Sequence, residues 1–528
     1  MLQKRTRQLS LADTDNWFKK IPETSVWHRL RTWREDNLTD EQFAPMYSNI
    51  GRPSVPPTYM MALLVIEMRQ GWSDREAVEA AMFDDRVKYA LGVSRSPEFT
   101  CERSTLCKFR ARAMENDMDR KLLGQTMRSA AQAGLLGDDE DLVDSFMVVG
   151  AAAKQGTYVL IHQAIRGVLG QMRRDEVSIP ELRRADYETH RKATIQWSDA
   201  AAREALLQEL VADARELVAH CRRRDDLCEE LRQRVELLST VTEQDIETLP
   251  DGSVAIAQRV AKERVISTVD SEMRHGRKTT SAKTDGYKCH LMSQNVESGE
   301  ARIITATAVT PANVADGDVA ADLVQERMEL TGVAPKQIMG DTAYGSASVQ
   351  EAVTGVSPGT EVFAPVPPSS NRKGRFAKTD FTIDTEAQTV TCPAGHTVSY
   401  QAKRKRTNVK PERVVKMDEE KCKTCPLQAQ CVGGKGPRTI RVRADEASIQ
   451  ERRKEQEAPE WQAHYRERSR VEHVNAEMTK HGARDGRYVG KRKTEFQMHI
   501  CAAAHNMMEI ERVRSIQQSP CEPREKCA

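Results

Sequence analysis

The stretch DEDLVDSFMVVGAA, residues 139–152, is an apolar run rich in β-branched residues that ends in glycine and alanine. This composition predicts a buried β-strand. Asp144 falls inside the run, and a carboxylate in a buried strand requires a partner because its charge is otherwise expensive to desolvate. From position alone, a structural role (a salt bridge or a strand-end cap) and a role as a metal ligand explain Asp144 about equally well.

Helical patterns lie on both sides of this strand. Upstream, residues 1–137 contain a capping box in which Ser73 is followed three residues later by Glu76. Downstream, residues 155–262 are helical in pattern and highly charged, and within them residues 201–238 carry leucine and valine at three- and four-residue spacing, which predicts an amphipathic helix pair. Strand patterns resume after this segment, so we interpret it as a helical insertion.

The later strand patterns complete the expected fold. Two alternating strands within residues 285–318 flank the turn NVESGE, and the short apolar strand KQIMGD ends at Asp341. A helix is expected between them, and EVFAPVPP is a further strand. The order predicts an α/β fold with a mixed sheet flanked by helices and interrupted twice. The expected parts are a helical N-terminal domain (1–137), a sheet domain (138–154, 263–368 and 438–511), the helical insertion (155–262), a cysteine-bearing insertion (369–437) and a disordered tail (512–528).

Composition limits the classes of protein to consider. A chain of 528 residues predicts two to four domains. The formal net charge is only +2, so a DNA-binding surface would have to come from local clusters of positive charge. The N-terminus lacks the apolar segment of a signal peptide, and the longest apolar run, YMMALLVI, is too short to cross a bilayer. We therefore expect a cytoplasmic protein whose cysteines are reduced thiols or metal ligands.

Carboxylates at strand ends point to a metal site. Asp341 stands at the carboxyl end of its strand, where open sheets place their ligands. Glu472 lies in YRERSRVEHVNAEMTK, residues 465–480, with Tyr465 and Arg468 within about 60° of it on an ideal helix. Three such carboxylates would form the oxygen-only site that Mg²⁺ or Mn²⁺ prefers. The chain has 78 acidic residues, so three carboxylates alone are a weak signal of a metal site. Taken by itself, the charged segment 465–480 favours a salt-bridged surface helix.

The order of the motifs resembles a known family. YRERSRVEHVNAEMTK resembles the Y-x2-R-x3-E-x6-K signature of bacterial insertion-sequence DDE transposases. LVDSFMVV and GDTAYGS are similar to that family's first- and second-aspartate segments. RHGRKTTSAKTDGYKCH and VTPANVADGD resemble the connecting segments, and FAPMYSNIGRPSVPPTYMMALLVIEM resembles the N-terminal transposase domain. The similarity covers most of residues 35–510, in the expected order, and outweighs the surface-helix interpretation.

This resemblance implies a ribonuclease H-like catalytic domain in which Asp144, Asp341 and Glu472 bind two Mg²⁺ or Mn²⁺ ions. Tyr465 and Arg468 would contact DNA phosphates near the cleaved end.

The match to the signature is imperfect at its last position. Thr479 occupies the signature position itself, and Lys480 is displaced from it by one residue. Asp270 and Asp285 are rival acids, and Asp270 ranks below Asp144 because it lies outside any apolar run.

The implied activity is cleavage of double-stranded DNA at terminal inverted repeats, followed by joining of the 3′-hydroxyl ends to target DNA. Pairing of two ends implies at least a homodimer, and no phosphate-binding glycine loop calls for a nucleotide cofactor. Two alternatives remain: a metal-dependent nuclease that cuts without joining, and a non-catalytic DNA-binding protein of transposase descent.

A cluster of four cysteines marks the second insertion. Cys392, Cys422, Cys425 and Cys431 have the spacing of a tetrahedral structural zinc site, which a small polar domain would need in order to fold, and His396 could replace one ligand. Reduced cysteines without a metal are the alternative, and an iron–sulfur cluster is a weaker one.

Basic residues supply candidate DNA contacts. Runs at 274–278, 371–378, 403–416 and 490–493 could follow a phosphate backbone. Sequence-specific contacts are expected from a helix within residues 100–117, through Lys108, Arg110 and Arg112. Salt bridges are an equally good explanation for these three side chains.

Overall fold

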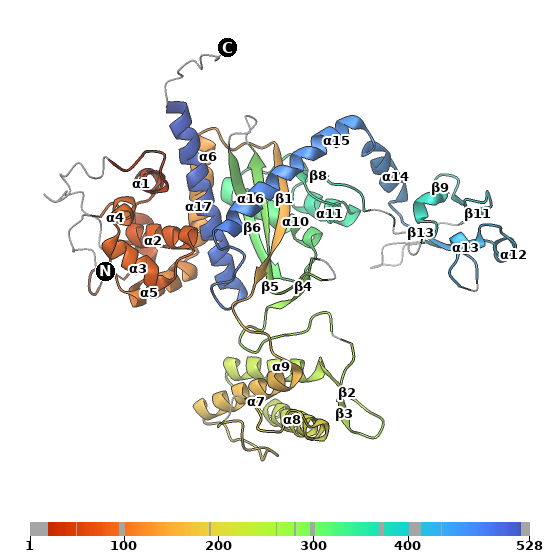
Figure 1. The fold of residues 1–528 in the computed structure, drawn as a ribbon, viewed down its shortest axis with the longest axis horizontal. Helices are drawn as coiled ribbons and strands as arrows, with labels where there is room; N and C mark the ends of the chain where they lie inside the picture. The colour runs from red at the N-terminus through yellow and green to blue at the C-terminus, as the bar shows by residue number, and fades with distance from the viewer. Residues whose placement is uncertain are drawn as a thin grey trace, which may run out of the picture. The chain divides into compact units, whose positions relative to one another are not determined.

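A computed structural model of the chain describes residues 20–48, 50–93, 101–189, 192–259, 261–278, 281–295, 301–367, 369, 374–400, 413–434 and 436–518. The chain divides into two units, which are described separately below (Figure 1). The first unit comprises Met1–Pro335 and Val471–Ala528, and the second comprises Lys336–Arg470.

The N-terminal part of the first unit is helical. Its elements are α1 (Val26–Asn37), η3 (Asp40–Met46), α2 (Pro57–Gln70), α3 (Asp74–Phe83), α4 (Asp85–Leu91), α5 (Arg103–Glu115) and α6 (Met118–Gln132). Helix α2 is buried along almost its whole length and ends at Gly71, whose φ of 67° lies in the left-handed region. The predicted capping box is present at the start of α3, where Ser73 Oγ accepts from the Glu76 amide and the Glu76 carboxylate accepts from the Ser73 amide.

An antiparallel group of strands follows. The strand predicted at 139–152 is present as β1 (Glu140–Val149), and it pairs with β5 (Lys283–Asn295) so that Asp144 lies opposite Leu291. β5 also pairs with β6 (Arg302–Pro311) and, near its start, with β4 (Arg274–Arg277). The two alternating strands are therefore present as an antiparallel pair, and most of the expected turn NVESGE lies outside the described residues.

Helices cover these strands. α10 (Ala320–Thr331) and α17 (Lys491–Gln518) both contact β6, and α17 also packs on α2 and α6 (Figure 1). The tail expected from residue 512 was placed wrongly for residues 512–518, because α17 continues to Gln518. Val513 is buried beside Ile510 and Ile303, and this apolar contact keeps the end of the helix on the sheet.

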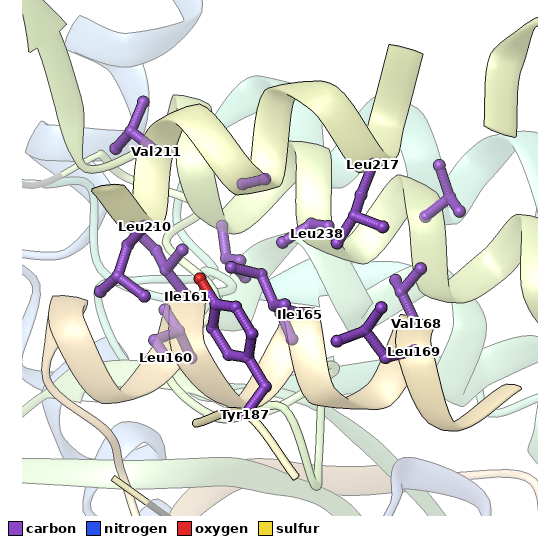
Figure 2. Close-up of a cluster of buried hydrophobic side chains, with 14 of the residues drawn as sticks. Leu160, Ile161, Ile165, Val168, Leu169, Tyr187, Leu210, Val211, Leu217 and Leu238 are labelled. Atoms are coloured by element: carbon purple, nitrogen blue, oxygen red, sulfur yellow. The ribbon is translucent and has the colours of Figure 1, made fainter. Parts of the chain in front are cut away.

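The helical segment 155–262, which the sequence analysis interprets as an insertion, has a hydrophobic core of its own. The helix pair expected within 201–238 is present as α8 (Ala200–Arg222) and α9 (Glu229–Glu243). A further helix, α7 (Thr157–Arg174), precedes the pair, and the short hairpin β2 (Ile246–Thr248) and β3 (Val254–Ile256) follows it. Figure 2 shows aliphatic side chains of all three helices meeting around Tyr187. The Tyr187 hydroxyl donates to Asp213 Oδ2 at 2.7 Å, so the one polar atom of this ring is satisfied inside the core.

The second unit begins with a parallel pair of strands, β7 (Gln337–Met339) and β8 (Glu361–Phe363), joined through α11 (Ala347–Val356). With the antiparallel strands of the first unit, this pair makes the fold mixed α/β, as predicted. The cysteine-bearing segment holds β9 (Thr382–Asp384), β10 (Thr389–Thr391), β11 (Thr397–Ser399), β12 (Arg413–Lys416), α12 (Glu419–Lys423), α13 (Gln428–Cys431) and β13 (Thr439–Val442). α14 (Glu446–Glu455), α15 (Pro459–Tyr465) and η6 (Arg466–Ser469) lead to α16 (Arg470–Lys480).

Candidate active site

Strand β1 carries two aspartates in different surroundings. The side chain of Asp141 is fully buried, and its Oδ2 accepts from Arg327 Nε at 2.7 Å and from Thr305 Oγ1 at 2.6 Å. Burial raises the pKa of Asp141, and the Arg327 guanidinium opposes that shift. Asp141 therefore belongs to a buried ion pair that joins β1 to α10.

Asp144 lies three residues further on and so projects from the opposite face of the strand. It is half-buried, and its Oδ2 accepts a hydrogen bond of 2.8 Å from Asn475 Nδ2. Asn475 belongs to α16, one turn after Glu472, which is exposed. The structure thus brings Asp144 against the helix that carries the second candidate carboxylate of this unit.

The third candidate, Asp341, belongs to the second unit. It follows β7 directly after Gly340, whose amide donates to the Phe363 carbonyl of β8 at 3.1 Å. A Cβ at Gly340 would lie 2.5 Å from the Tyr344 ring, so the tight turn requires glycine there. Asp341 Oδ1 accepts from the Ala343 amide at 2.8 Å. The carboxylate therefore stands at the carboxyl end of a parallel strand pair, as the sequence predicted.

The two rival acids have structural roles. Asp270 is buried and accepts hydrogen bonds from the Tyr287 hydroxyl at 2.6 Å and from the backbone amides of Glu272, Met273 and Gly490. Asp285 accepts from His275 at 2.5 Å and pairs with Lys154 at 3.1 Å. The ranking of Asp270 below Asp144 agrees with these contacts.

The helix that carries Glu472 is not continuous with the segment before it. α15 ends at Tyr465, the 3₁₀ turn η6 follows, and α16 begins at Arg470. The assumption of a single α-helix across this region was therefore wrong. A 3₁₀ turn has about three residues per turn instead of 3.6, so it changes the angles between side chains on either side of it. The spacing that related Tyr465 and Arg468 to Glu472 does not hold in the structure.

Tyr465 takes part in an aromatic stack within the second unit. Its ring lies 5.0 Å from that of Trp461, and Trp461 lies 4.8 Å from Phe363 at the end of β8. Interplanar angles of 24° and 28° show that the rings are stacked. Lys480, in the first unit, is an exposed residue at the end of α16, and its Nζ lies 3.5 Å from Glu477 Oε1.

The three basic candidates on α5 differ in burial. Lys108 is exposed, and the Arg112 guanidinium lies 5.3 Å from the centre of the Tyr47 ring. Arg110 is buried and pairs with Asp74 at 2.7 Å and with Glu67 at 3.1 Å. The expectation that Arg110 contacts DNA was wrong, because its guanidinium is used inside the protein; the salt-bridge alternative holds for this residue.

The Glu67 carboxylate is the centre of a buried network that the sequence interpretation missed. Arg487, in the segment after α16, donates to Glu67 Oε1 at 2.7 Å and also to the Trp72 carbonyl. Arg110 stacks on Tyr488 at 4.9 Å. The network therefore connects α2, α3 and α5 of the N-terminal helices to the chain that follows α16. A glutamate inside the apolar run YMMALLVIEM was a signal that could have revealed it.

We expect the network to make the stability of the protein depend on pH. Burial raises the pKa of Glu67 from its ordinary value of 4.5 to about 7, against the effect of Arg110 and Arg487. A carboxyl with a raised pKa favours the folded state at low pH, and that contribution, roughly 3 kcal/mol, is lost as pH rises from about 4.5 to about 7. We expect Glu67→Gln to flatten the decline in melting temperature between about pH 5 and pH 8. Parallel pH profiles of the variant and the wild type would contradict this expectation.

The four clustered cysteines surround one cavity. Cys392, Cys422, Cys425 and Cys431 all line it, together with His396. The Cys425 amide donates to the Cys422 carbonyl at 3.4 Å, and the Cys392 amide donates to the His396 carbonyl at 2.9 Å. Burial raises the pKa of Cys431, and the three other thiols add to the shift. In the described part of the chain, no three His, Cys, Asp or Glu side chains are already arranged to hold a metal ion.

Several of the basic runs are occupied by internal contacts or lie outside the described residues. Arg492 forms an ion pair with the buried Asp119 at 2.9 Å, and Lys491 pairs with Glu495 at 3.5 Å. Residues 371–373 and 403–412 lie outside the described residues. None of the helices within the described ranges is long and apolar enough to cross a membrane.

Two protein-family models match parts of the chain. A family model described as a transposase DDE domain matches residues 391–510, and one described as a transposase domain (DUF772) matches residues 15–112. Searches of curated proteins and of solved structures gave no match. Both matches are to transposase domains, and together they support an insertion-sequence DDE transposase, as the resemblance indicated.

The two matched ranges include some of the candidate site residues and leave out others. The DDE match begins one residue before Cys392 and includes all four cysteines, Tyr465, Arg468 and Glu472. Asp144 and Asp341 lie outside both matches.

Proposed function

We propose that this transposase cuts DNA at the ends of its element and joins the released 3′-hydroxyl groups to target DNA. The observation that carries the proposal is the hydrogen bond between Asp144 and Asn475, which holds the strand aspartate against the helix of Glu472. A partner of this kind leaves Asp144 in contact with solvent, unlike the sealed pair of Asp141 and Arg327. A half-buried carboxylate of this kind is compatible with a role as a metal ligand.

Asp144, Asp341 and Glu472 would together hold two Mg²⁺ or Mn²⁺ ions on a ribonuclease H-like domain. Glu472 is exposed and the two aspartates are half-buried, so none of the three carboxylates is sealed from solvent. Bound divalent ions would activate the attacking water or hydroxyl and stabilise the leaving oxygen in phosphoryl transfer. The three oxygen-only side chains match the ligand preference of these ions.

The residues proposed to contact DNA supply charge and hydrogen bonds to the phosphate backbone. Arg468 and Lys480 would donate to phosphate oxygens, and the Tyr465 hydroxyl would add a further donor. Lys108 and Arg112 on α5 would contact the inverted repeats. Two element ends have to be held at once, so the active complex would be at least a homodimer, in a nucleoid-associated setting and without a nucleotide cofactor.

A joining assay tests the proposal. DNA carrying both flanks of the coding sequence is incubated with the protein and Mg²⁺ or Mn²⁺, and cleaved and joined products are mapped by sequencing. We expect free 3′-hydroxyl ends and their covalent joining to target DNA. Cleavage without joining would favour the nuclease alternative, and DNA binding without either reaction would favour a non-catalytic protein.

We further propose that Cys392, Cys422, Cys425 and Cys431 hold a structural zinc ion, with His396 as the alternative to one of these ligands. Four soft thiols around one cavity fit the tetrahedral coordination of zinc. The apolar cluster beside them is small, and Ile383, Val390 and Val415 are among its members. A segment with so little core gains stability from a bound metal.

Metal analysis of purified protein tests the zinc site. We expect about one zinc per chain, and we expect the double variant Cys422→Ser/Cys425→Ser to lose it and to expose the segment to proteolysis. Cys107→Ser is the matched control, because Cys107 is an exposed cysteine on α5 outside the cluster. Purified wild-type protein free of zinc, or a double variant that retains it, would contradict the assignment.

A further inference from the structure

Asn475 stands at the contact between Asp144 and helix α16, and its amide group is held in one orientation. Its Nδ2 donates to Asp144 Oδ2 at 2.8 Å. An amide oxygen in that place would face the carboxylate oxygen and be repelled, so the NH₂ group has to point at Asp144. The opposite atom, Oδ1, is thereby fixed as well.

The Oδ1 atom of Asn475 is buried, and no hydrogen-bond donor reaches it from the part of the chain that the structure describes. Buried acceptors are almost always paired, because an unpaired one loses its hydrogen bonds to water without compensation. An orphan acceptor directly beside a candidate metal ligand indicates that its donor is supplied when the site is occupied.

Helix α16 does not need this amide for its attachment. Val471, Val474 and Met478 are all buried on the same helix and fix it by apolar contact. An apolar side chain at position 475 would serve packing without leaving a buried acceptor unpaired. The polar side chain is therefore explained by the carboxylate that it contacts.

We propose that Asn475 is a positioning residue for the metal site. Its NH₂ group fixes the Asp144 carboxylate, and its Oδ1 accepts a hydrogen bond from a water molecule bound to the cation. The contact also ties Asp144 to the helix of Glu472, so the two carboxylates of the first unit are oriented together. This inference rests on the proposed function, because it takes Asp144 to be a metal ligand.

Binding of Mn²⁺ to the full-length protein without DNA, measured by calorimetry, tests the inference apart from activity. Partners that orient metal ligands typically account for about 10- to 100-fold in metal affinity. We expect that loss in both Asn475→Leu and Asn475→Ala, which differ in volume but both lack the amide. The melting temperature of Asn475→Leu without metal should stay near that of the wild type, because the apolar contacts of α16 are kept. Glu477→Gln, on the same helix, is the control and should bind Mn²⁺ as the wild type does.

The outcomes separate this inference from the proposed function. Wild-type Mn²⁺ affinity in either Asn475 variant, while Asp144→Asn loses binding, would overturn the role of Asn475 and leave the metal site standing. Unchanged Mn²⁺ binding in Asp144→Asn would overturn the proposed metal site itself and the inference with it. Weakened binding in the two Asn475 variants and in Asp144→Asn, with the control unchanged, supports both.

Discussion

Replacing Asp144 by asparagine is expected to reduce cleavage of element-end DNA by about 1,000-fold or more. A metal ligand contributes through several kcal/mol of transition-state stabilisation, and each 1.36 kcal/mol corresponds to about a factor of ten in rate. Asparagine keeps the shape of the side chain but removes the negative charge that the cation requires. Rates of strand cleavage under single-turnover conditions measure the effect.

The matched control for this variant is Asp285→Asn. Asp285 is also an aspartate of the first unit, but it pairs with His275 and Lys154 and has no place in the proposed site. We expect Asp285→Asn to cleave at close to the wild-type rate and Asp144→Asn to melt close to the wild-type temperature. Cleavage retained by Asp144→Asn would remove this residue from the active site, and a loss confined to Asp285→Asn would reverse the ranking of the two acids.

Replacing Arg327 by methionine is expected to destabilise the first unit by about 3–5 kcal/mol, the cost of leaving one member of a buried ion pair without its partner. Both side chains of the Arg327–Asp141 pair are fully buried. Arg327 also donates to the backbone carbonyls of Gly137 and Val333. The variant therefore also loses the hydrogen bonds that hold the segment before β1 and the segment after α10. The shift of the urea unfolding midpoint measures the effect.

The double variant Asp141→Leu/Arg327→Met distinguishes an unpaired charge from lost packing. Buried ion pairs replaced by apolar residues of similar size are often nearly neutral in stability. We expect the double variant to recover most of the loss caused by Arg327→Met. Equal destabilisation in the single and double variants would show that the charge of Asp141 is not the cause.

Local patterns in the sequence were sufficient to predict the strand that carries Asp144 and the short strand that precedes Asp341. The run of β-branched residues and the short apolar stretch KQIMGD each predict a buried strand from their own composition. The capping box at Ser73 was predictable for the same reason, because its two hydrogen bonds join residues three apart. Each of these features depends on neighbours in the chain.

Features that depend on distant contacts could not be predicted in this way. Asn475 has the sequence context of a solvated residue in a charged helix, and its contact with Asp144, 331 residues away in the chain, becomes visible only in the structure. Arg110 has the spacing of a DNA-contacting residue, but Glu67 and Asp74, from two other helices, bury it. In both cases tertiary packing decides the environment of a polar side chain.

The sequence also gave no indication of the 3₁₀ turn that interrupts the helix before Glu472. The segment RERS contains no proline or glycine that would predict a 3₁₀ turn, and helical spacing was extended through it. The resemblance singled out Tyr465 but could not predict its aromatic stack with Trp461 and Phe363. Phe363 lies on a strand about a hundred residues earlier, outside the reach of local sequence patterns.

The central claim is that Asp144, Asp341 and Glu472 bind the same divalent ions, although they come from two units of the chain. Iron-directed cleavage tests it most directly: Fe²⁺ replaces Mg²⁺, peroxide and ascorbate generate radicals at the metal, and the backbone is cut where it lies close to the ion. We expect cuts near Asp144, Asp341 and Glu472 together, suppressed by excess Mg²⁺ and absent in Asp144→Asn. Cuts confined to one of the two units, or unchanged in Asp144→Asn, would contradict a shared metal site.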